Sequence, residues 1–178
     1  MVNHLKDFKI QFSGLPFGYH QYQLDADDKF FEAIEYSEVK KGTVKVDIEL
    51  EKQERFLILN FDIDGTVIVP CDRCLDDLEC EVSGQNRLIV KFGDEAGEES
   101  EDVVIIPRTD HQFDVSHLVY EYIILMLSPQ RMHQEDENGN LVCDPEILAR
   151  LRNENIQQDQ DQGSDPRWDS LKGLKFED

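Results

Sequence analysis

The sequence is poor in positive charge and has no long apolar run. Its 178 residues include 18 lysines and arginines against 39 aspartates and glutamates, which gives a formal net charge of −21. Such a charge repels phosphate backbones except where basic side chains gather locally, so general binding to nucleic acid is disfavoured. The longest wholly apolar run, residues 122–127, is far shorter than the roughly 20 residues of a membrane-spanning helix, so no membrane contact is expected.

Cysteine is also scarce, with four residues in the chain. Residues 1–12 alternate in polarity and lack the apolar segment of a signal peptide, which favours a cytoplasmic location. In that compartment the four thiols indicate reduced side chains or a metal site, because disulfide frameworks belong to exported proteins. The length is sufficient for one domain with a substantial core and too short for two of ordinary size.

Alternation of polar and apolar residues dominates the first two-thirds of the chain. A period of two is typical of half-buried strands, and no helical pattern interrupts these segments. The sequence therefore predicts an α+β fold built on an antiparallel β-sheet or a partly closed barrel. The segments with this pattern are 8–12, 43–50, 55–63, 66–69 and 78–92, with a further strand expected at 102–107.

The periodicity changes after an acidic segment, 93–102, which is predicted to be a solvated loop because it has almost nothing to bury. Asp114 is a plausible N-cap for a helix that Pro129 ends, and Asp144 with Pro145 predicts the start of a second helix. Residues 1–154 are expected to form the single domain. Residues 155–178 are predicted to be a polar linker followed by a short amphipathic tail helix.

The stretch "FDIDGTV", residues 61–67, has the Asp-x-Asp-Gly-Thr letters of a phosphatase of the haloacid-dehalogenase type. In such an enzyme Asp62 would be the nucleophile and Asp64 the general acid/base. That fold requires a βαβ unit after the motif, whereas predicted strands fill the residues that follow. We therefore expect no enzymatic activity, and interpret Asp64-Gly65 as a tight turn between antiparallel strands, with glycine supplying a positive φ.

The cysteines give the most specific indication of a site. Cys71 and Cys74 form a C-x-x-C motif, a spacing with which two thiolates bind one tetrahedral zinc ion. With His133 and Cys143 they would complete a Cys₃His set for one structural zinc, which would join the sheet to the region between the two helices. The alternative is a group of ordinary core thiols and a surface histidine. Cys80 alternates with apolar neighbours and is expected to be a buried thiol that acts as a small hydrophobic residue.

Several segments, in this order, resemble the bacterial YceD-like family, which is named for accumulation of the large ribosomal RNA subunit. They are "VPCDRCLDDLECEV", the helix "VYEYIILMLSPQRMH", Cys143 and the terminal "DPRWDSLKGLK", and together they cover about residues 60–175. The matching positions are Cys71, Arg73, Cys74 and Leu75 in the motif, Asp114, Glu121, Ile123, Ile124, Leu125 and Pro129 in the helix, and Asp165, Pro166, Leu171 and Leu174 in the tail.

The resemblance implies a role in ribosome biogenesis, no catalytic residue, and a metal half-site formed by His133 and Cys143. Because the charge disfavours direct binding to RNA, the expected partner is a basic ribosomal protein or a precursor of the large ribosomal subunit. Direct contact with ribosomal RNA is the alternative, through a local patch of Arg73, Arg87 and Lys91. Trp168 in the tail is a further candidate for partner contact, and packing of the tail on the domain is the slightly favoured alternative.

Overall fold

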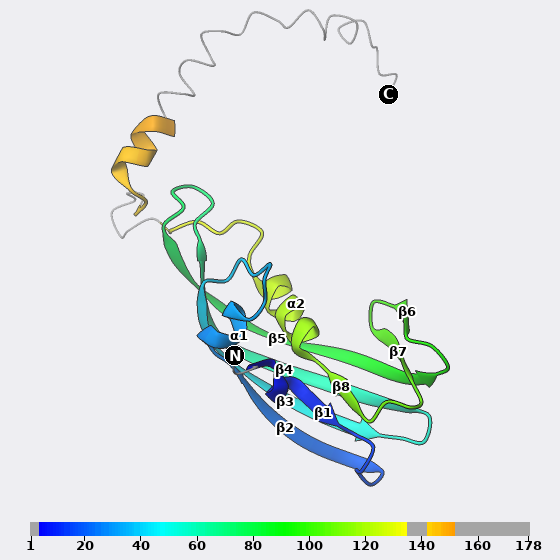
Figure 1. Cartoon of the computed structure of the whole chain (residues 1–178). Helices are drawn as coiled ribbons and strands as arrows, with labels where there is room; N and C mark the ends of the chain where they lie inside the picture. Colours follow the sequence, from blue (N-terminus) through cyan, green and yellow to red (C-terminus); the bar gives the residue numbers. More distant parts are fainter. Residues whose placement is uncertain (1–3, 135–141, 152–178) are drawn as a thin grey trace, which may run out of the picture. The chain divides into compact units, whose positions relative to one another are not determined.

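The computed structural model describes residues 4–134 and 142–151 (Figure 1). The chain divides into two compact units, Met1–Met132 and His133–Asp178, and each is described by itself. The predicted linker and tail at 155–178, including Trp168, lie outside the described residues. No described helix has the length and apolar character needed to cross a membrane.

The first unit is built on a six-stranded sheet with the order β2-β3-β4-β5-β7-β6. Neighbouring strands are antiparallel except β5 and β7, which are parallel. A small second sheet pairs β1 with β8. The elements in chain order are η1 (His4–Phe8), β1 (Lys9–Gln11), β2 (Gly18–Ala26), α1 (Asp28–Glu32), β3 (Lys41–Lys52), β4 (Phe56–Pro70), β5 (Asp77–Gly93), β6 (Gly97–Ser100), β7 (Val103–Pro107), β8 (Gln112–Asp114) and α2 (Ser116–Met126).

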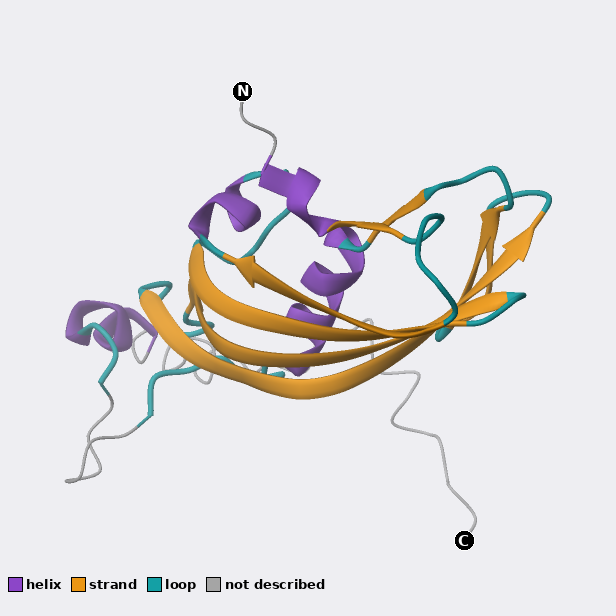
Figure 2. Cartoon of the chain, turned by 90° about the horizontal axis from the view of Figure 1, so that it is seen from below, coloured by secondary structure: helices purple, strands orange, loops and turns teal. Residues whose placement is uncertain are grey.

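The long central strands of the first unit curve around α1 and α2, which lie on the concave side of the sheet (Figure 2). In β3 every second residue from Val44 to Leu50 is buried, and the residues between them are exposed. This alternation places one face of the sheet against α1 and α2 and leaves the other face to solvent. The core between sheet and helices contains Phe30 and Phe31 of α1, Phe61 of β4 and Ile123 of α2.

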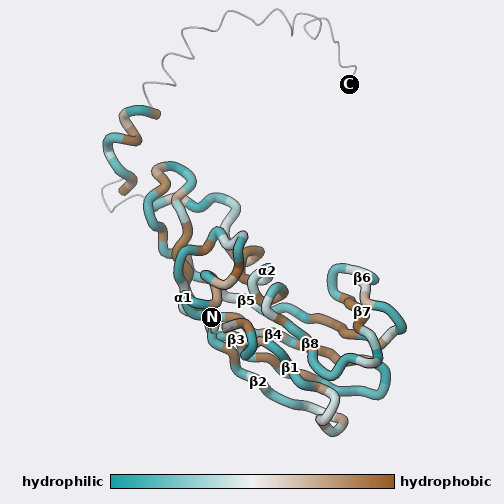
Figure 3. The backbone as a smooth tube through the Cα atoms, viewed as in Figure 1, coloured by the Kyte–Doolittle hydropathy of each residue, from teal (hydrophilic) through white to brown (hydrophobic). Residues whose placement is uncertain are grey.

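The predicted α+β class and mostly antiparallel sheet are confirmed, but the barrel is not closed. In the part of the chain that the structure describes, the sheet is open, with β2 and β6 as its edges. The parallel pairing of β5 with β7 was not predicted, and part of the segment predicted as an acidic loop, 93–102, forms the edge strand β6. All four residues of β6 are exposed, and Figure 3 shows this strand as hydrophilic beside the hydrophobic β7.

Strand β2 and helix α1 were also not predicted. β2 contains few β-branched or aliphatic residues, so its alternation is weak in the sequence. Helix α1 is only five residues long, and its start depends on Asp27, whose Oδ1 accepts hydrogen bonds from the backbone N–H groups of Lys29 and Phe30, both at 3.1 Å. Such a side-chain cap replaces partners that the first turn of a helix lacks.

The prediction of a turn at Asp64-Gly65 is wrong, because β4 continues from Phe56 to Pro70. Gly65 lies between Val44 of β3 and Val82 of β5. A Cβ atom at this position would lie 2.3 Å from the backbone oxygen of Thr43 and 2.6 Å from Cα of Val44. Glycine is therefore required for the close approach of two strands, and not for a positive φ.

Helix α2 forms where it was predicted, with a small shift of its cap. Val115 occupies the N-cap position, while Oδ1 of Asp114 accepts hydrogen bonds from Ser116 N at 3.0 Å and Ser116 Oγ at 2.6 Å. In the second unit, residues 145–151 are helical, as the Asp144-Pro145 pair predicted. Asp144 Oδ1 accepts a hydrogen bond from the backbone N–H of Glu146 at 2.7 Å, the contact expected of a capping aspartate.

Candidate metal centre

The C-x-x-C motif forms the turn between the two longest strands. β4 ends at Pro70, which pairs with Asp77 at the start of β5. Within the turn, Cys71 N donates to Asp76 O and Leu75 N donates to Cys71 O, both at 2.9 Å. The backbone N–H of Arg73 points at Cys71 Sγ, at 3.5 Å. An N–H group directed at sulfur stabilises the thiolate, the form that binds a metal ion.

Leu75 has an unusual backbone conformation in this turn. Its φ is +64°, and it is the one non-glycine residue with a positive φ among those that the structure describes. The left-handed region costs a residue with a Cβ atom about 1–2 kcal/mol. The side chain is 71% exposed, so burial in the core does not offset this cost. The turn therefore holds Leu75 in a strained conformation next to a candidate metal ligand.

We expect the Leu75→Gly variant to be as stable as the unmodified protein or more stable by up to about 1 kcal/mol. Glycine relieves the left-handed strain, and its extra freedom in the unfolded chain cancels part of the gain. Leu75→Ala retains the Cβ atom and is expected to give no gain. Urea titration of the three proteins measures the difference, and a loss of more than about 1 kcal/mol in Leu75→Gly would show that the exposed side chain is stabilising.

The second pair of candidate ligands lies in the second unit. His133 is half-buried, and its Nδ1 lies 3.8 Å from Sγ of the buried Cys143. Cys143 directly precedes Asp144, the residue that caps the helix at 145–151. The capping hydrogen bond of Asp144 therefore restrains the backbone directly after Cys143.

The ligand atoms of Cys71, Cys74, His133 and Cys143 all lie within 4.8 Å of one another. A tetrahedral zinc ion with Zn–S bonds of about 2.3 Å separates two sulfur ligands by roughly 3.8 Å. Three thiols and one imidazole are also a donor set typical of structural zinc sites. The structure thus brings the four predicted residues together, at distances that are compatible with one zinc ion.

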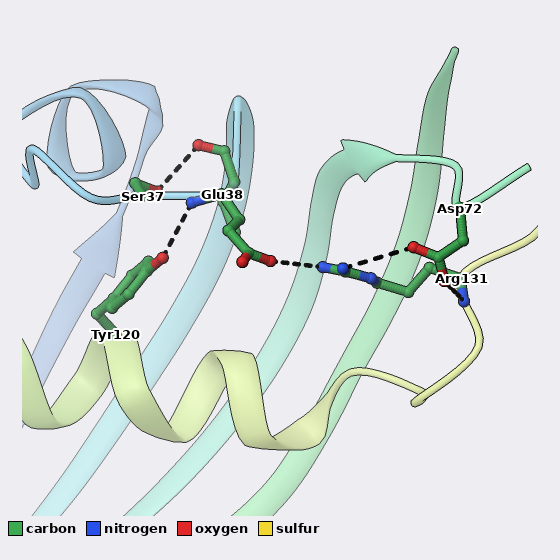
Figure 4. A network of polar contacts seen from close by, with 6 residues as sticks. Ser37, Glu38, Asp72, Tyr120 and Arg131 are labelled. Atoms are coloured by element: carbon green, nitrogen blue, oxygen red, sulfur yellow. Dashed lines mark hydrogen bonds and ion pairs between the residues drawn. The ribbon is translucent and has the colours of Figure 1, made fainter. Parts of the chain in front are cut away.

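Arg131 joins the C-x-x-C turn to the segment that follows α2 (Figure 4). Its backbone oxygen accepts from Asp72 N, and its backbone N–H donates to Asp72 Oδ2, both at 2.7 Å. The guanidinium lies 2.9 Å from Glu38 Oε2 and 3.5 Å from Asp72 Oδ1. The hydrogen bond to Glu38 raises the pKa of Arg131, with the charge of Asp72 acting in the same direction. This arrangement was not predicted from the sequence.

Cys80 lies on β5 and is not one of the clustered residues. It is half-buried and packs against the hydrophobic core, close to the buried position expected of it. Burial raises the pKa of its thiol; the charge of Arg131 lowers it and that of Asp72 raises it.

The predicted cationic residues are not brought together as one patch. Arg73 lies in the C-x-x-C turn, whereas Arg87 lies ten residues after Asp77 on β5, about 33 Å along the strand. Lys91 forms an ion pair with Glu99 at 2.7 Å. Trp168 lies outside the described residues. No described arrangement thus favours the alternative of direct RNA contact through these three cations.

Asp62 and Asp64 lie in the middle of β4, between two antiparallel neighbours. Both side chains are exposed, and Asp62 Oδ2 accepts a hydrogen bond from Gln85 Nε2 at 3.3 Å. The phosphatase motif instead requires its first aspartate at the end of a parallel strand, next to the loop that holds the phosphate. The surroundings of Asp62 therefore differ from that arrangement.

The solvent face of the sheet is strongly acidic. Strand register places the exposed residues of β2, β3, β4 and β5 on this one face. Its exposed acidic residues number eight and its exposed basic residues three. They are Asp25, Asp47, Glu49, Asp62, Asp64, Asp77, Glu79 and Glu81, against Lys41, Lys45 and Arg87. We call this surface the acidic face.

The acidic face contains a pair of opposed like charges and a groove. Asp47 lies directly opposite Asp62, and like charges at paired positions destabilise a sheet. Both residues line a groove of about 910 Å³ that crosses the four strands, together with Gln23, Glu49 and Arg87. A hollow lined by carboxylates and amides offers many hydrogen-bond acceptors to a cationic surface.

These features define the class of the protein. It is an α+β protein with an open, mostly antiparallel sheet, a cysteine-containing turn between its longest strands, and a Cys₃His cluster. The chain belongs to the family described as "Large ribosomal RNA subunit accumulation protein YceD", whose model matches residues 59–175. The resemblance found in the sequence is thereby confirmed, and the family description links the chain to accumulation of large-subunit ribosomal RNA. No curated protein and no solved structure matches the chain significantly.

Proposed function

We propose that the protein is a non-enzymatic ribosome biogenesis factor that binds a basic ribosomal protein or a precursor of the large ribosomal subunit. The observation that carries this proposal is the acidic face, with eight carboxylates against three cations. Family membership supplies the process, and the acidic face supplies the chemistry of the partner. The cytoplasm, where ribosomal proteins meet their RNA in bacteria, is the location that fits this role.

Charge complementarity explains how such a factor would act. A net charge of −21 accelerates encounter with a cationic partner and disfavours contact with exposed RNA. The paired Asp47 and Asp62 repel each other in the unbound protein. A lysine or arginine placed between them would relieve this repulsion, so part of the binding free energy would come from a cost already present in the fold.

One structural zinc ion is part of the proposal. Cys71, Cys74, His133 and Cys143 would hold it, and four protein ligands would leave no open coordination position for a substrate. Zinc in a closed site stabilises a fold and does not activate water. The zinc would therefore support the shape of the protein, and binding would remain a property of its surface.

Charge reversal on the acidic face tests the proposal. The full chain, tagged and purified from its host, is expected to retain ribosomal proteins or large-subunit precursors, identified by mass spectrometry and by sedimentation. The double variant Asp47→Lys, Asp62→Lys is expected to retain at least about tenfold less, a loss of about 1.4 kcal/mol in binding free energy. The expected retention should also fall as salt is raised.

The matched control is Glu95→Lys, Glu98→Lys, which changes the net charge equally at exposed positions away from the acidic face. It is expected to retain the partner almost as well as the unmodified chain. Equal losses in both double variants would mean that total charge, and not the acidic face, governs binding. Failure of the unmodified chain to enrich any ribosomal component over an untagged sample would refute the proposed function.

A further inference from the structure

A second surface of the first unit is apolar and concave. It is a groove of about 420 Å³ between the C-terminal half of α2 and the segment that follows α1. Its volume is within the range of sites that accept a small ligand or one large side chain. The lining residues are Tyr36, Glu38, Tyr120, Glu121, Ile124 and Leu125. We call it the α2 groove.

The groove exposes apolar side chains that the core does not use. Leu125 is 76% exposed and Tyr36 is 58% exposed, whereas Val119 and Ile123 on the other side of α2 are fully buried. Single exposed apolar residues are common on protein surfaces. Here, however, two of them line the same hollow together with the ring of Tyr120, so the apolar surface is contiguous.

The walls of the groove are held in place before any partner binds. Tyr36 Oη lies 2.7 Å from His117 Nδ1, and its ring packs edge-on against Tyr120 with centroids 5.5 Å apart. Tyr120 Oη accepts a hydrogen bond from the backbone N–H of Glu38 at 3.0 Å, as Figure 4 shows. The carboxylate of Glu38 is in turn held by Arg131. A groove fixed in this way loses little conformational entropy on binding.

Carboxylates lie beside the apolar surface. Two glutamates line the groove: Glu38 from the segment before β3, and Glu121 from α2. The Glu38 carboxylate forms an ion pair with Arg131, whereas the Glu121 side chain is exposed to solvent. This pattern is complementary to an apolar side chain with lysine or arginine close to it. Phosphate backbones, anionic membranes and a second copy of this acidic chain are disfavoured by the same charges.

We infer that the α2 groove is a docking site for a basic polypeptide segment of the partner, with one aliphatic or aromatic side chain inserted beside Tyr36 and Leu125 and a cation of the segment next to Glu121. The inference rests on the proposed function, since it assigns a second contact surface to the same partner. The acidic face would supply long-range attraction, and the groove would supply a buried anchor, the kind of contact that dominates affinity in most interfaces.

Binding of proteins extracted from purified large ribosomal subunits tests the inference. The full-length chain is immobilised, the retained ribosomal proteins are identified, and the dissociation constant of the most enriched one is measured. Leu125→Asp is expected to weaken that binding at least tenfold, and Glu121→Lys to weaken it several-fold. Because both side chains are exposed, both variants should keep the circular dichroism spectrum of the unmodified protein.

Phe17→Asp is the matched control, because Phe17 is 70% exposed and lies away from the groove, near Lys52. It is expected to bind like the unmodified chain. Normal binding by Leu125→Asp and Glu121→Lys would show that the α2 groove is not a docking site, while leaving the proposed function intact. Absence of binding by the unmodified chain would overturn both, so the two failures are distinguishable. If Leu125→Asp alters the spectrum, Glu121→Lys and Leu125→Ala decide the result.

Discussion

The protein purified without a metal-binding tag is expected to contain one zinc ion per chain, and the Cys74→Ser variant is expected to contain none. Three of the four clustered ligands are buried thiols, and serine is a poor zinc ligand. Zinc binding to such a site contributes directly to folding. Its loss should therefore lower the free energy of unfolding by about 3–5 kcal/mol and the melting temperature by roughly 9–15 °C.

Cys80→Ser is the matched control for this experiment. Cys80 is half-buried, lies on β5 and is outside the cluster, so this variant should keep its zinc and lose only about 1 kcal/mol of stability. Elemental analysis and scanning calorimetry of the three proteins give the two readouts. A zinc-free unmodified protein, or a Cys74→Ser variant with a full complement of zinc, would show that the cluster is not a zinc site.

The Gly65→Ala variant is expected to be destabilised by about 3 kcal/mol, a fall in melting temperature of roughly 9 °C. The added methyl group would lie 2.3 Å from a backbone oxygen and 2.6 Å from a backbone Cα atom of β3. Backbone atoms cannot move away as a flexible side chain could, so β3 and β4 must separate. Both strands are hydrogen-bonded to a neighbour on each side, so this separation disturbs the sheet. The cost falls on the centre of the sheet.

Gly97→Ala provides the comparison, because a Cβ atom there meets nothing within 4 Å. Gly97 also lies in a strand, β6, so both variants make the same glycine-to-alanine replacement within a strand. We expect Gly97→Ala to change the free energy of unfolding by less than about 0.5 kcal/mol. Denaturant titration of both variants measures the difference. Equal stabilities would contradict the interpretation of Gly65 as a point of close strand contact.

The central strands and α2 were predictable because each has one face in the core. In β3 and β5 the burial of alternate residues leaves a period of two in the sequence, and α2 shows a helical period with proline beyond its end. β2 is an edge strand with only one neighbour in the sheet, so its sequence is less constrained. The prediction for Gly65 was wrong because glycine is needed both in tight turns and where a neighbouring backbone leaves no room for a Cβ atom. A single sequence does not distinguish these two reasons.

The cysteine cluster was predictable from residue type, since few side chains bind zinc and the chain has few of them. The Arg131 contacts were not, because Glu38, Asp72 and Arg131 are separated by long stretches of sequence and meet only through the path of the chain. The same holds for the acidic face and the α2 groove. Both depend on which strands and helices become neighbours, information that periodicity does not contain.

Strand β6 has a consequence for how the protein behaves at high concentration. An open sheet offers unpaired N–H and C=O groups at its edges, and these can pair with strands of other chains. Here one edge is a strand of four exposed residues, two of them glutamates, within an acidic segment. Two such edges repel each other, and neither is apolar enough to lose water readily. The negative charge of residues 93–102 thus disfavours edge-to-edge aggregation of the sheet.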